Sequence, residues 1–278
     1  MENTRTKTTR NSLILLLTAA IWGMAFVSQS KGMDYMHPFT FNGVRSLIGA
    51  ASILVYILIS RKIAGDKAAP LDWKLNVKAG LLCGIFLTIA STLQQFGIKY
   101  TSVGKAGFIT TLYIIFVPMF GIFLKKKVAP VVWAAAVMAA VGMYLLCMTE
   151  SLRLGAGDIM VFLCAIAFAI QIMTVDHYAA RIDGAVVSCI QFTVCGVVCC
   201  IGALIWGQPT FGQLQEGLGA LLYAGVLSCG VGYTLQIVGQ KGLNPTVAAL
   251  IMSLESVIAT ISGWIAYKIG FLTTDQTL

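Results

Sequence analysis

Two stretches of the chain share one sequence pattern. Residues 92–113 (TLQQFGIKYTSVGKAGFITTLY) align without gaps on residues 234–255 (TLQIVGQKGLNPTVAALIMSLE), and eight of the twenty-two positions are identical. Each copy holds the end of one apolar segment, a short polar turn and the start of the next apolar segment. Chance similarity between apolar helices explains shared leucines, but not a Thr-Leu-Gln triplet in register with shared Gly and Lys. We interpret the pair as an internal duplication, which in a strongly apolar chain points to a transporter.

The composition indicates that lipid solvates much of the chain. Hydrophobic residues make up 58% of the sequence and charged residues only 11%, whereas a soluble domain carries roughly 25% charged residues. Backbone polar groups inside a bilayer must bond to one another, so the apolar segments are expected to form helices. The net charge of +8 does not indicate nucleic-acid binding, because the basic residues lie in short tracts between apolar runs.

Nine segments have close to the roughly 20 residues that a helix needs to cross the hydrocarbon core. They are residues 12–30, 39–60, 77–98, 104–124, 131–149, 159–175, 185–206, 218–238 and 246–267. The connecting segments are short and contain turn formers such as Asn244-Pro245. The predicted fold class is therefore an all-α polytopic membrane protein.

The duplicated stretches fall in the third and fourth spans and in the eighth and ninth. A shift of five spans is odd, so the two copies must cross the bilayer in opposite directions, and inverted repeats of this kind enclose a site near the midplane. A weaker echo pairs Trp22 with Phe168 and Arg45 with Gln191. We expect an inverted repeat of two five-helix units, residues 1–150 and 151–278. The implied ten-helix fold would have its last helix missing from this chain, which has nine spans.

The positions of Lys and Arg predict the orientation. With a cytoplasmic N-terminus, thirteen of the Lys and Arg residues between or near the ends of the spans lie on the cytoplasmic side and five on the outer side, as the positive-inside rule requires. The second half alone splits two against two and gives no independent support. We expect a multi-pass protein of the cell membrane with its N-terminus in the cytoplasm.

The sequence contains no motif that is typical of a cofactor or metal site. The eight cysteines lie inside apolar segments without C-x-x-C spacing, which is typical of buried thiols that act as small hydrophobes. The two histidines, His37 and His177, are far apart in the sequence. A phosphate-binding loop of the G-x-x-x-x-G-K-[ST] type is not found, so we do not expect an ATP-driven pump. No cofactor and no metal is predicted.

Four fragments of the sequence resemble the EamA family of the drug/metabolite transporter superfamily. They are AAIWG at residues 19–23, FNGVR at 41–45, YTSVGKA at 100–106 and AALIMSLE at 248–255. The resemblance covers essentially the whole chain and implies secondary transport, often export, of small metabolites such as amino acids. The family usually has Pro after the glutamate of the last fragment, where this chain has Ser256. A helix kink at that point is therefore left open.

Glu255 lies well inside the last predicted span. An ionised carboxylate at the centre of a helix in lipid costs roughly 2.5–3.5 kcal/mol, so we expect Glu255 to face the helix bundle or a cavity. It shares a helical stripe with Ala248, Met252, Ala259 and Ser262. Two interpretations remain. Glu255 is a site for a proton or a substrate amine, because burial favours a protonated carboxyl group, or it is a structural group that bonds to a neighbouring helix.

Three further polar residues stand inside predicted spans. Arg45, on a stripe with Asn42, either grips an anionic group of the substrate or ties helices together by pairing with Glu255, and the tie is the favoured interpretation. Gln94 and Gln236 belong to the repeated triplet. They either form interhelical hydrogen bonds, which is the usual role of such amides, or line the substrate pathway.

The predicted substrate pathway combines these residues with aromatic and amide side chains from other spans. Its members are Trp22, Asn42, Arg45, Gln94, Tyr113, Gln171, Tyr233, Gln236 and Glu255, with Gln29 as a further candidate. Lys105, at the start of a span, is expected to reach out to the membrane surface. The Gly80-x-x-x-Gly84 motif predicts a close helix contact.

The leading hypothesis is a secondary transporter, an exporter of small metabolites that works by alternating access, with proton coupling as an option. The alternative is a membrane-embedded lipid-modifying enzyme, which needs a cluster of His, Asp and Glu near one membrane face. The intramembrane ionisable residues of this chain are isolated in the sequence, which disfavours the enzyme. Expected partners are a small-molecule substrate, the lipid bilayer and, with proton coupling, protons. Nucleic acid is not an expected partner, and the sequence leaves the oligomeric state open.

Overall fold

The computed structural model describes residues 2–65, 70–123 and 155–277, with scattered residues between 130 and 145. Within these residues the secondary structure is helical, and eight spans are long and apolar enough to cross a membrane. This confirms the prediction of an all-α polytopic membrane protein. The predicted span at residues 131–149 falls for the most part outside the described residues.

The first four spans come from five helices. They are α1 (Glu2–Gly32), α2 (Pro38–Ala64), α3 (Trp73–Ile98), and the pair α4 (Val103–Thr110) and α5 (Tyr113–Phe123). Polar side chains before the helices cap their first turns. The Asp72 side chain accepts a hydrogen bond from Leu75 N at 3.0 Å and the Ser102 hydroxyl accepts one from Lys105 N at 3.3 Å, which satisfies N–H groups that have no partner inside the helix.

The second half repeats this layout with more irregular helices. Its first two spans are α7 (Ala156–Tyr178) and α8 (Gly184–Gly202), the latter continued by the π-helical turn η2 (Ala203–Gly207). After the short α9 (Phe211–Glu216), the next span joins α10 (Leu218–Leu222), the π-helix η3 (Tyr223–Gly232) and α11 (Tyr233–Gln240). The last span consists of α12 (Pro245–Met252) and α13 (Glu255–Lys268), and α14 (Thr274–Thr277) follows it.

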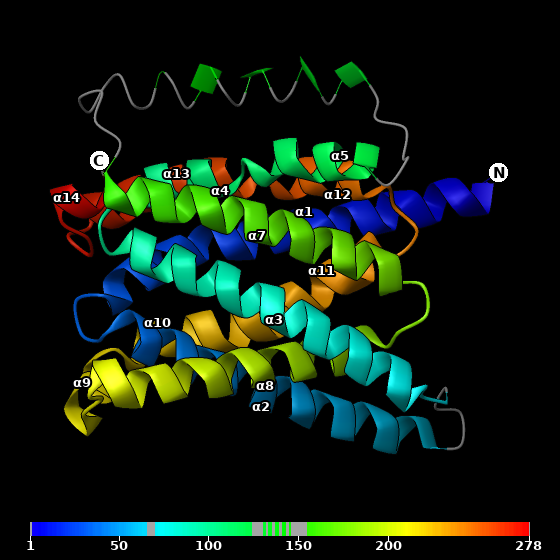
Figure 1. Cartoon of the computed structure of the whole chain (residues 1–278), viewed down its shortest axis with the longest axis horizontal. Helices are drawn as coiled ribbons and strands as arrows, with labels where there is room; N and C mark the ends of the chain where they lie inside the picture. Colours follow the sequence, from blue (N-terminus) through cyan, green and yellow to red (C-terminus); the bar gives the residue numbers. More distant parts are fainter. Residues whose placement is uncertain are drawn as a thin grey trace.

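Equivalent helices of the two halves run in opposite directions (Figure 1). In that view α1 and α3 run from right to left, whereas their counterparts α7 and α11 run from left to right. The counterparts α2 and α8 are opposed in the same way, as are α4–α5 and α12–α13. This arrangement confirms the inverted repeat that the odd shift of five spans predicts.

The two halves pack against each other through α2 on α8, α3 on α7 and α8, and α1 on α13. The predicted glycine motif lies at one of these contacts. A Cβ atom on Gly80 would stand 2.6 Å from Ile190 Cβ, and one on Gly84 would stand 2.9 Å from Val194 Cβ. Because α3 and α8 approach so closely there, only glycine fits, and the predicted close contact is confirmed.

The fourth and the last described spans are broken at equivalent positions of the repeat. The first break separates Thr110 of α4 from Tyr113 of α5, and the second separates Met252 of α12 from Glu255 of α13. The backbone stays close to helical at both points, since Thr111, Ser253 and Leu254 keep right-handed helical angles.

The same side-chain hydrogen bond accompanies both breaks. The Thr111 hydroxyl donates to Phe108 O at 2.8 Å, and the Ser253 hydroxyl donates to Leu250 O at 2.8 Å. Such bonds from Ser and Thr to the preceding turn bend helices. The regular helical hydrogen bonding of the last span thus changes at Ser253 and Leu254, with Ser256 and no proline following Glu255.

Candidate functional site

A cavity of about 40 Å³ lies between the two halves of the molecule. One water needs roughly 10–15 Å³ on this measure, so the cavity in this conformation has room for a few waters only. All nine residues of the predicted pathway line it, and so does Gln29. They come from α1, α2, α3, α5, α7, α11 and α13. The tertiary structure thus brings together residues that are spread over most of the chain.

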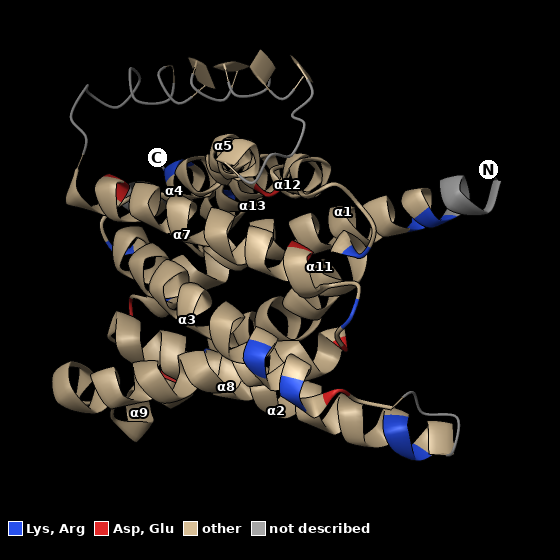
Figure 2. Ribbon diagram, turned by 45° about the vertical axis from the view of Figure 1, so that its right-hand side comes forward, with Lys and Arg blue, Asp and Glu red and all other residues tan. Residues whose placement is uncertain are grey.

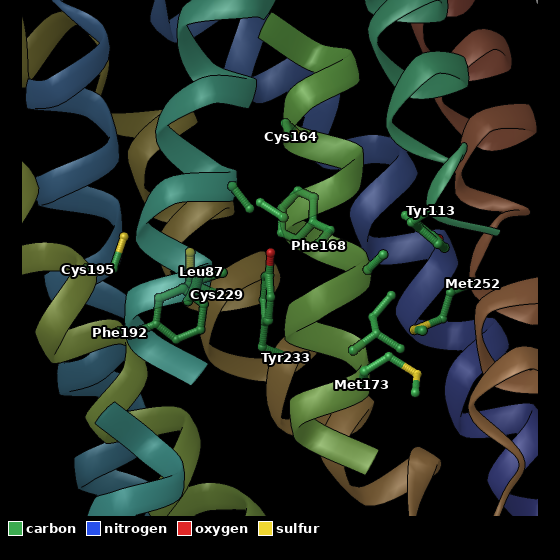
Figure 3. Close-up of a cluster of buried hydrophobic side chains, with 14 of the residues drawn as sticks. Leu87, Tyr113, Cys164, Phe168, Met173, Phe192, Cys195, Cys229, Tyr233 and Met252 are labelled. Atoms are coloured by element: carbon green, nitrogen blue, oxygen red, sulfur yellow. The ribbon is translucent and has the colours of Figure 1, made fainter. Parts of the chain in front are cut away.

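Aromatic rings form one wall of the cavity. The Tyr233 ring centroid lies 4.5 Å from that of Trp22 and 4.9 Å from that of Phe192. Figure 3 shows Tyr233 between Phe192 on α8 and Phe168 on α7. The Trp22 indole Nε1 donates to Ser228 O in the π-helix η3 at 3.4 Å. This wall couples α1 of the first half to α7, α8, η3 and α11 of the second.

Arg45 is buried, with 5% of its surface exposed, and lines the cavity. Its Nε donates to Asn42 Oδ1 at 3.0 Å, which is its only hydrogen bond to the described residues, and the guanidinium lies 5.5 Å from the Phe41 ring centroid. The expected ion pair with Glu255 is not formed. The favoured interpretation of Arg45 as a tie to Glu255 is therefore wrong, because Arg45 takes its partners from its own helix.

Glu255 is the first residue of α13, is 3% exposed and lines the same cavity. Within the described ranges it has no ion-pair partner. Its neighbours along the helical stripe, Met252 and Ala259, are buried, while Leu254 is 43% exposed. The prediction that Glu255 faces the interior is confirmed.

The Tyr113 hydroxyl interacts with the carboxyl group of Glu255 inside the cavity. The hydroxyl is buried beside the Glu255 carboxyl group, without a hydrogen bond of good geometry to any residue that the structure describes. A buried polar group without a partner is costly and calls for an explanation. A ligand, a water or a proton that bridges Tyr113 and Glu255 would satisfy both groups.

The repeated glutamines form hydrogen bonds between helices and also line the cavity. Gln94 Nε2 donates to Thr110 Oγ1 at 3.2 Å, and Gln236 Nε2 donates to Gln171 Oε1 at 3.3 Å. Gln171 Nε2 in turn donates to Gln191 Oε1 at 3.4 Å. The two interpretations of these glutamines are thus compatible, and Gln236 Oε1 remains without a described partner.

Lys105 does not reach the membrane surface, and that expectation is wrong. Its Nζ lies 2.8 Å from Asp158 Oδ2, and the two side chains are only 8% and 4% exposed. Thr101 Oγ1 donates to Asp158 Oδ1 at 2.7 Å and Gly155 N donates to Asp158 Oδ2 at 2.9 Å. Because Asp158 is held at the start of α7, it offers Lys105 a buried partner, and the pair ties the two halves at one end of the bundle.

Several cavity residues were not identified from the sequence. They are Phe26, Ser91, Thr110, Phe168, Phe192, Ser228 and Cys229, with apolar neighbours such as Leu87. Phe168 had one signal, because the weaker echo of the repeat places it opposite Trp22. The others are small polar or aromatic groups that are common in packed transmembrane helices, so the sequence offers no signal for them. Among the described residues, no group of three or more His, Cys, Asp and Glu side chains is arranged to hold a metal ion.

Comparison with known proteins identifies the family. The model of the EamA-like transporter family matches residues 10–148 and 155–275. The chain belongs to this family. The EamA-like chain is therefore a multi-pass membrane protein of a transporter family, in agreement with the resemblance seen in its sequence.

Relatives of this EamA-like chain carry transporter names without further function. An uncharacterized transporter of Archaeoglobus fulgidus is 30% identical over 171 residues, which cover 59% of this chain and 48% of the relative. The uncharacterized transporter YwfM of Bacillus subtilis is 27% identical over 256 residues, 91% of this chain and 84% of the relative. The match thus spans less than half of the archaeal relative and most of the bacterial one.

A solved crystal structure shares the fold. It superposes with a TM-score of 0.71 at 17% sequence identity, and the match covers 95% of this chain and 90% of the other. At this identity the likeness establishes the arrangement of the helices and nothing about substrate.

Proposed function

We propose that this EamA-like transporter exports small metabolites, foremost amino acids, across the bacterial cell membrane by alternating access coupled to protons. One observation supports the proposal above all. Arg45 from the first half and Glu255 from the second line the same cavity, and neither pairs with a described residue of opposite charge. Buried charges are expensive unless they are compensated. A zwitterionic substrate supplies both missing charges.

Arg45 is the proposed site for the substrate carboxylate. Its Nε is held by Asn42, which leaves the Nη groups for a ligand in the cavity. A guanidinium group matches a carboxylate with two parallel hydrogen bonds. Lysine would offer the charge without this geometry.

Glu255 is the proposed site for the substrate amine or, in its absence, for a proton. Neutralising the carboxylate by either route removes the cost of moving it between states of the transporter. Tyr113 beside it supplies a hydroxyl group that has no other described partner. Exchange of amine for proton at one carboxylate would couple export to the proton gradient.

The small size of the cavity supports alternating access. At about 40 Å³ it is too small for a metabolite, so the two halves must separate at one end for loading. We further propose that the end with the N-terminus is cytoplasmic. That end carries Lys7, Arg10, Arg61, Lys62 and Lys241. It lies on the right of Figure 2, where much of the Lys and Arg is drawn.

Counterflow in proteoliposomes tests this function. Vesicles with purified protein are loaded with one unlabelled amino acid at a time, and uptake of the same labelled amino acid is followed. A transient accumulation above equilibrium for at least one amino acid is expected, and Arg45→Leu should abolish it. Arg61→Leu is the matched control, because Arg61 lies on the same helix with 36% of its side chain exposed.

Two outcomes would contradict the proposal. The absence of counterflow for every amino acid would remove amino acids as the substrate class. Chemical conversion of added phospholipid, detected by mass spectrometry of the vesicle lipids, would favour the lipid-modifying enzyme instead.

A further inference from the structure

Asn42 joins Arg45 to polar groups on two other helices. Arg45 Nε donates to Asn42 Oδ1 at 3.0 Å, while Asn42 Nδ2 donates to Ser91 Oγ at 3.1 Å and to Cys199 Sγ at 3.2 Å. Asn42 is 1% exposed. The three partners lie on α2, α3 and α8, so the amide contacts both halves of the inverted repeat.

The chemistry of the partners fixes which way the amide points. Arginine has only N–H donors, so the atom of Asn42 that faces it must be the oxygen, and the nitrogen must face Ser91 and Cys199. The remaining contacts of Nδ2, Thr92 Oγ1 at 3.4 Å and Cys195 Sγ at 3.9 Å, are longer. With Oδ1 and both N–H groups engaged, Asn42 has no polar hydrogen left for a substrate.

We propose that Asn42 is a positioning residue rather than a substrate ligand. It holds Nε of Arg45, so that the two Nη groups of the guanidinium face the cavity in the orientation that a substrate carboxylate requires. The inference deepens the proposed function and rests on its assignment of Arg45 to the carboxylate. Because Asn42 is anchored on α3 and α8, it also sets the position of Arg45 relative to both halves.

A substrate pair that differs only in the carboxylate tests the inference. The probes are L-alanine and L-alaninamide, used as substrates for counterflow in proteoliposomes. The wild-type protein should favour L-alanine. Asn42→Ala should raise the half-saturating concentration of L-alanine roughly tenfold, the effect of losing one charge-assisted hydrogen bond. It should leave that of L-alaninamide unchanged.

Ser46→Ala is the matched control. Ser46 lies on the same helix, is 1% exposed and donates to Cys195 Sγ at 3.4 Å, whereas the Arg45 Nε bonds to Asn42 and not to Ser46. This variant should behave as the wild type toward both probes. Equal losses for the acid and the amide in Asn42→Ala would indicate a merely structural role and overturn the inference. A wild-type protein that does not distinguish the two probes would instead contradict the proposed role of Arg45.

A spectroscopic measurement tests the contact without any substrate. In nanodiscs with ¹⁵N-labelled arginine, the Arg45 Nε–H signal is assigned by its loss in Arg45→Lys. Its proton should exchange slowly with water in the wild type and at least tenfold faster in Asn42→Ala. Unchanged exchange would overturn the inference whatever the transport assays show.

A second variant covers the case in which Asn42→Ala does not fold. Cys199→Ala removes one acceptor of Asn42 Nδ2 and should accelerate the exchange of the Arg45 Nε proton in the same direction, though less strongly. Cys199→Ser restores a hydrogen-bonding atom at that place and should return the exchange toward the wild-type rate. Failure of the serine variant to differ from the alanine variant would contradict the anchoring role.

Discussion

Tyr113 and Glu255 occupy the same position in the two copies of the repeat, and the fold places them next to each other at the cavity. Each is the first residue after the break in its span. The duplication thus produced two equivalent half-helix starts, one with a phenol and one with a carboxylate. The inverted topology is the reason that they meet, because it brings equivalent positions together near the midplane.

Glu255→Gln should abolish transport driven by a pH gradient and leave the amount of protein in the membrane unchanged. Glutamine keeps the size of the side chain but cannot take up a proton. The measurement is the uptake or efflux of the labelled amino acid in proteoliposomes with and without a pH difference. A variant that still responds to the gradient like the wild type would remove the proton from the role of Glu255.

Tyr113→Phe should leave thermal stability in place while slowing transport driven by the pH gradient. The Tyr113 hydroxyl makes no hydrogen bond of good geometry to the described residues, so its removal should change the free energy of unfolding by less than about 1 kcal/mol. Thermal unfolding in detergent and the transport assay measure the two effects. A large loss of stability would show that the hydroxyl has a structural role.

Asp158→Ala should destabilise the protein strongly, because it removes a buried acidic partner of Lys105. Breaking a buried pair from one side typically costs about 3–5 kcal/mol, and this pair is 8% and 4% exposed at a separation of 2.8 Å. Thermal unfolding in one detergent gives the measure. Arg61→Ala is the control, because the Arg61–Asp183 pair is over a third exposed and should contribute about 0–1 kcal/mol. Equal effects of the two changes would contradict this account.

Gly80→Ala should weaken the packing of α3 on α8. The added methyl group would stand 2.6 Å from Ile190 Cβ, and overpacking of this kind costs about 1–3 kcal/mol. Gly212→Ala is the control, since no atom lies within 4 Å of its Cβ position. Both variants are compared by thermal unfolding, and a Gly80→Ala protein as stable as the control would refute the close contact.

Cysteine labelling should establish the orientation. Tyr100→Cys and Arg181→Cys place thiols at exposed turns on opposite ends of the bundle. With a cytoplasmic N-terminus, an impermeant maleimide should label Tyr100→Cys in intact cells and Arg181→Cys only after the membrane is opened. The wild-type protein gives the background, and the reverse pattern would show that the N-terminus lies outside.

Much of the fold was determined by the sequence alone. The length and apolarity of the segments predicted the eight described spans, since a helix needs about 20 residues to cross the hydrocarbon. The aligned copies at residues 92–113 and 234–255 predicted the inverted topology, because an odd shift leaves no other direction. A charged side chain that faces lipid is energetically unfavourable, so Glu255 and Arg45 were expected to face the interior, and both are buried.

Only the tertiary structure decided which of these residues touch. Arg45 forms a hydrogen bond with Asn42 and no ion pair with Glu255. Lys105 forms an ion pair with Asp158, and Tyr113 lies beside Glu255. A side chain's partner depends on the register and rotation of packed helices, which a periodic apolar pattern does not encode. The sequence therefore identified which polar groups must be buried, and the packing of α1 to α13 decided their neighbours.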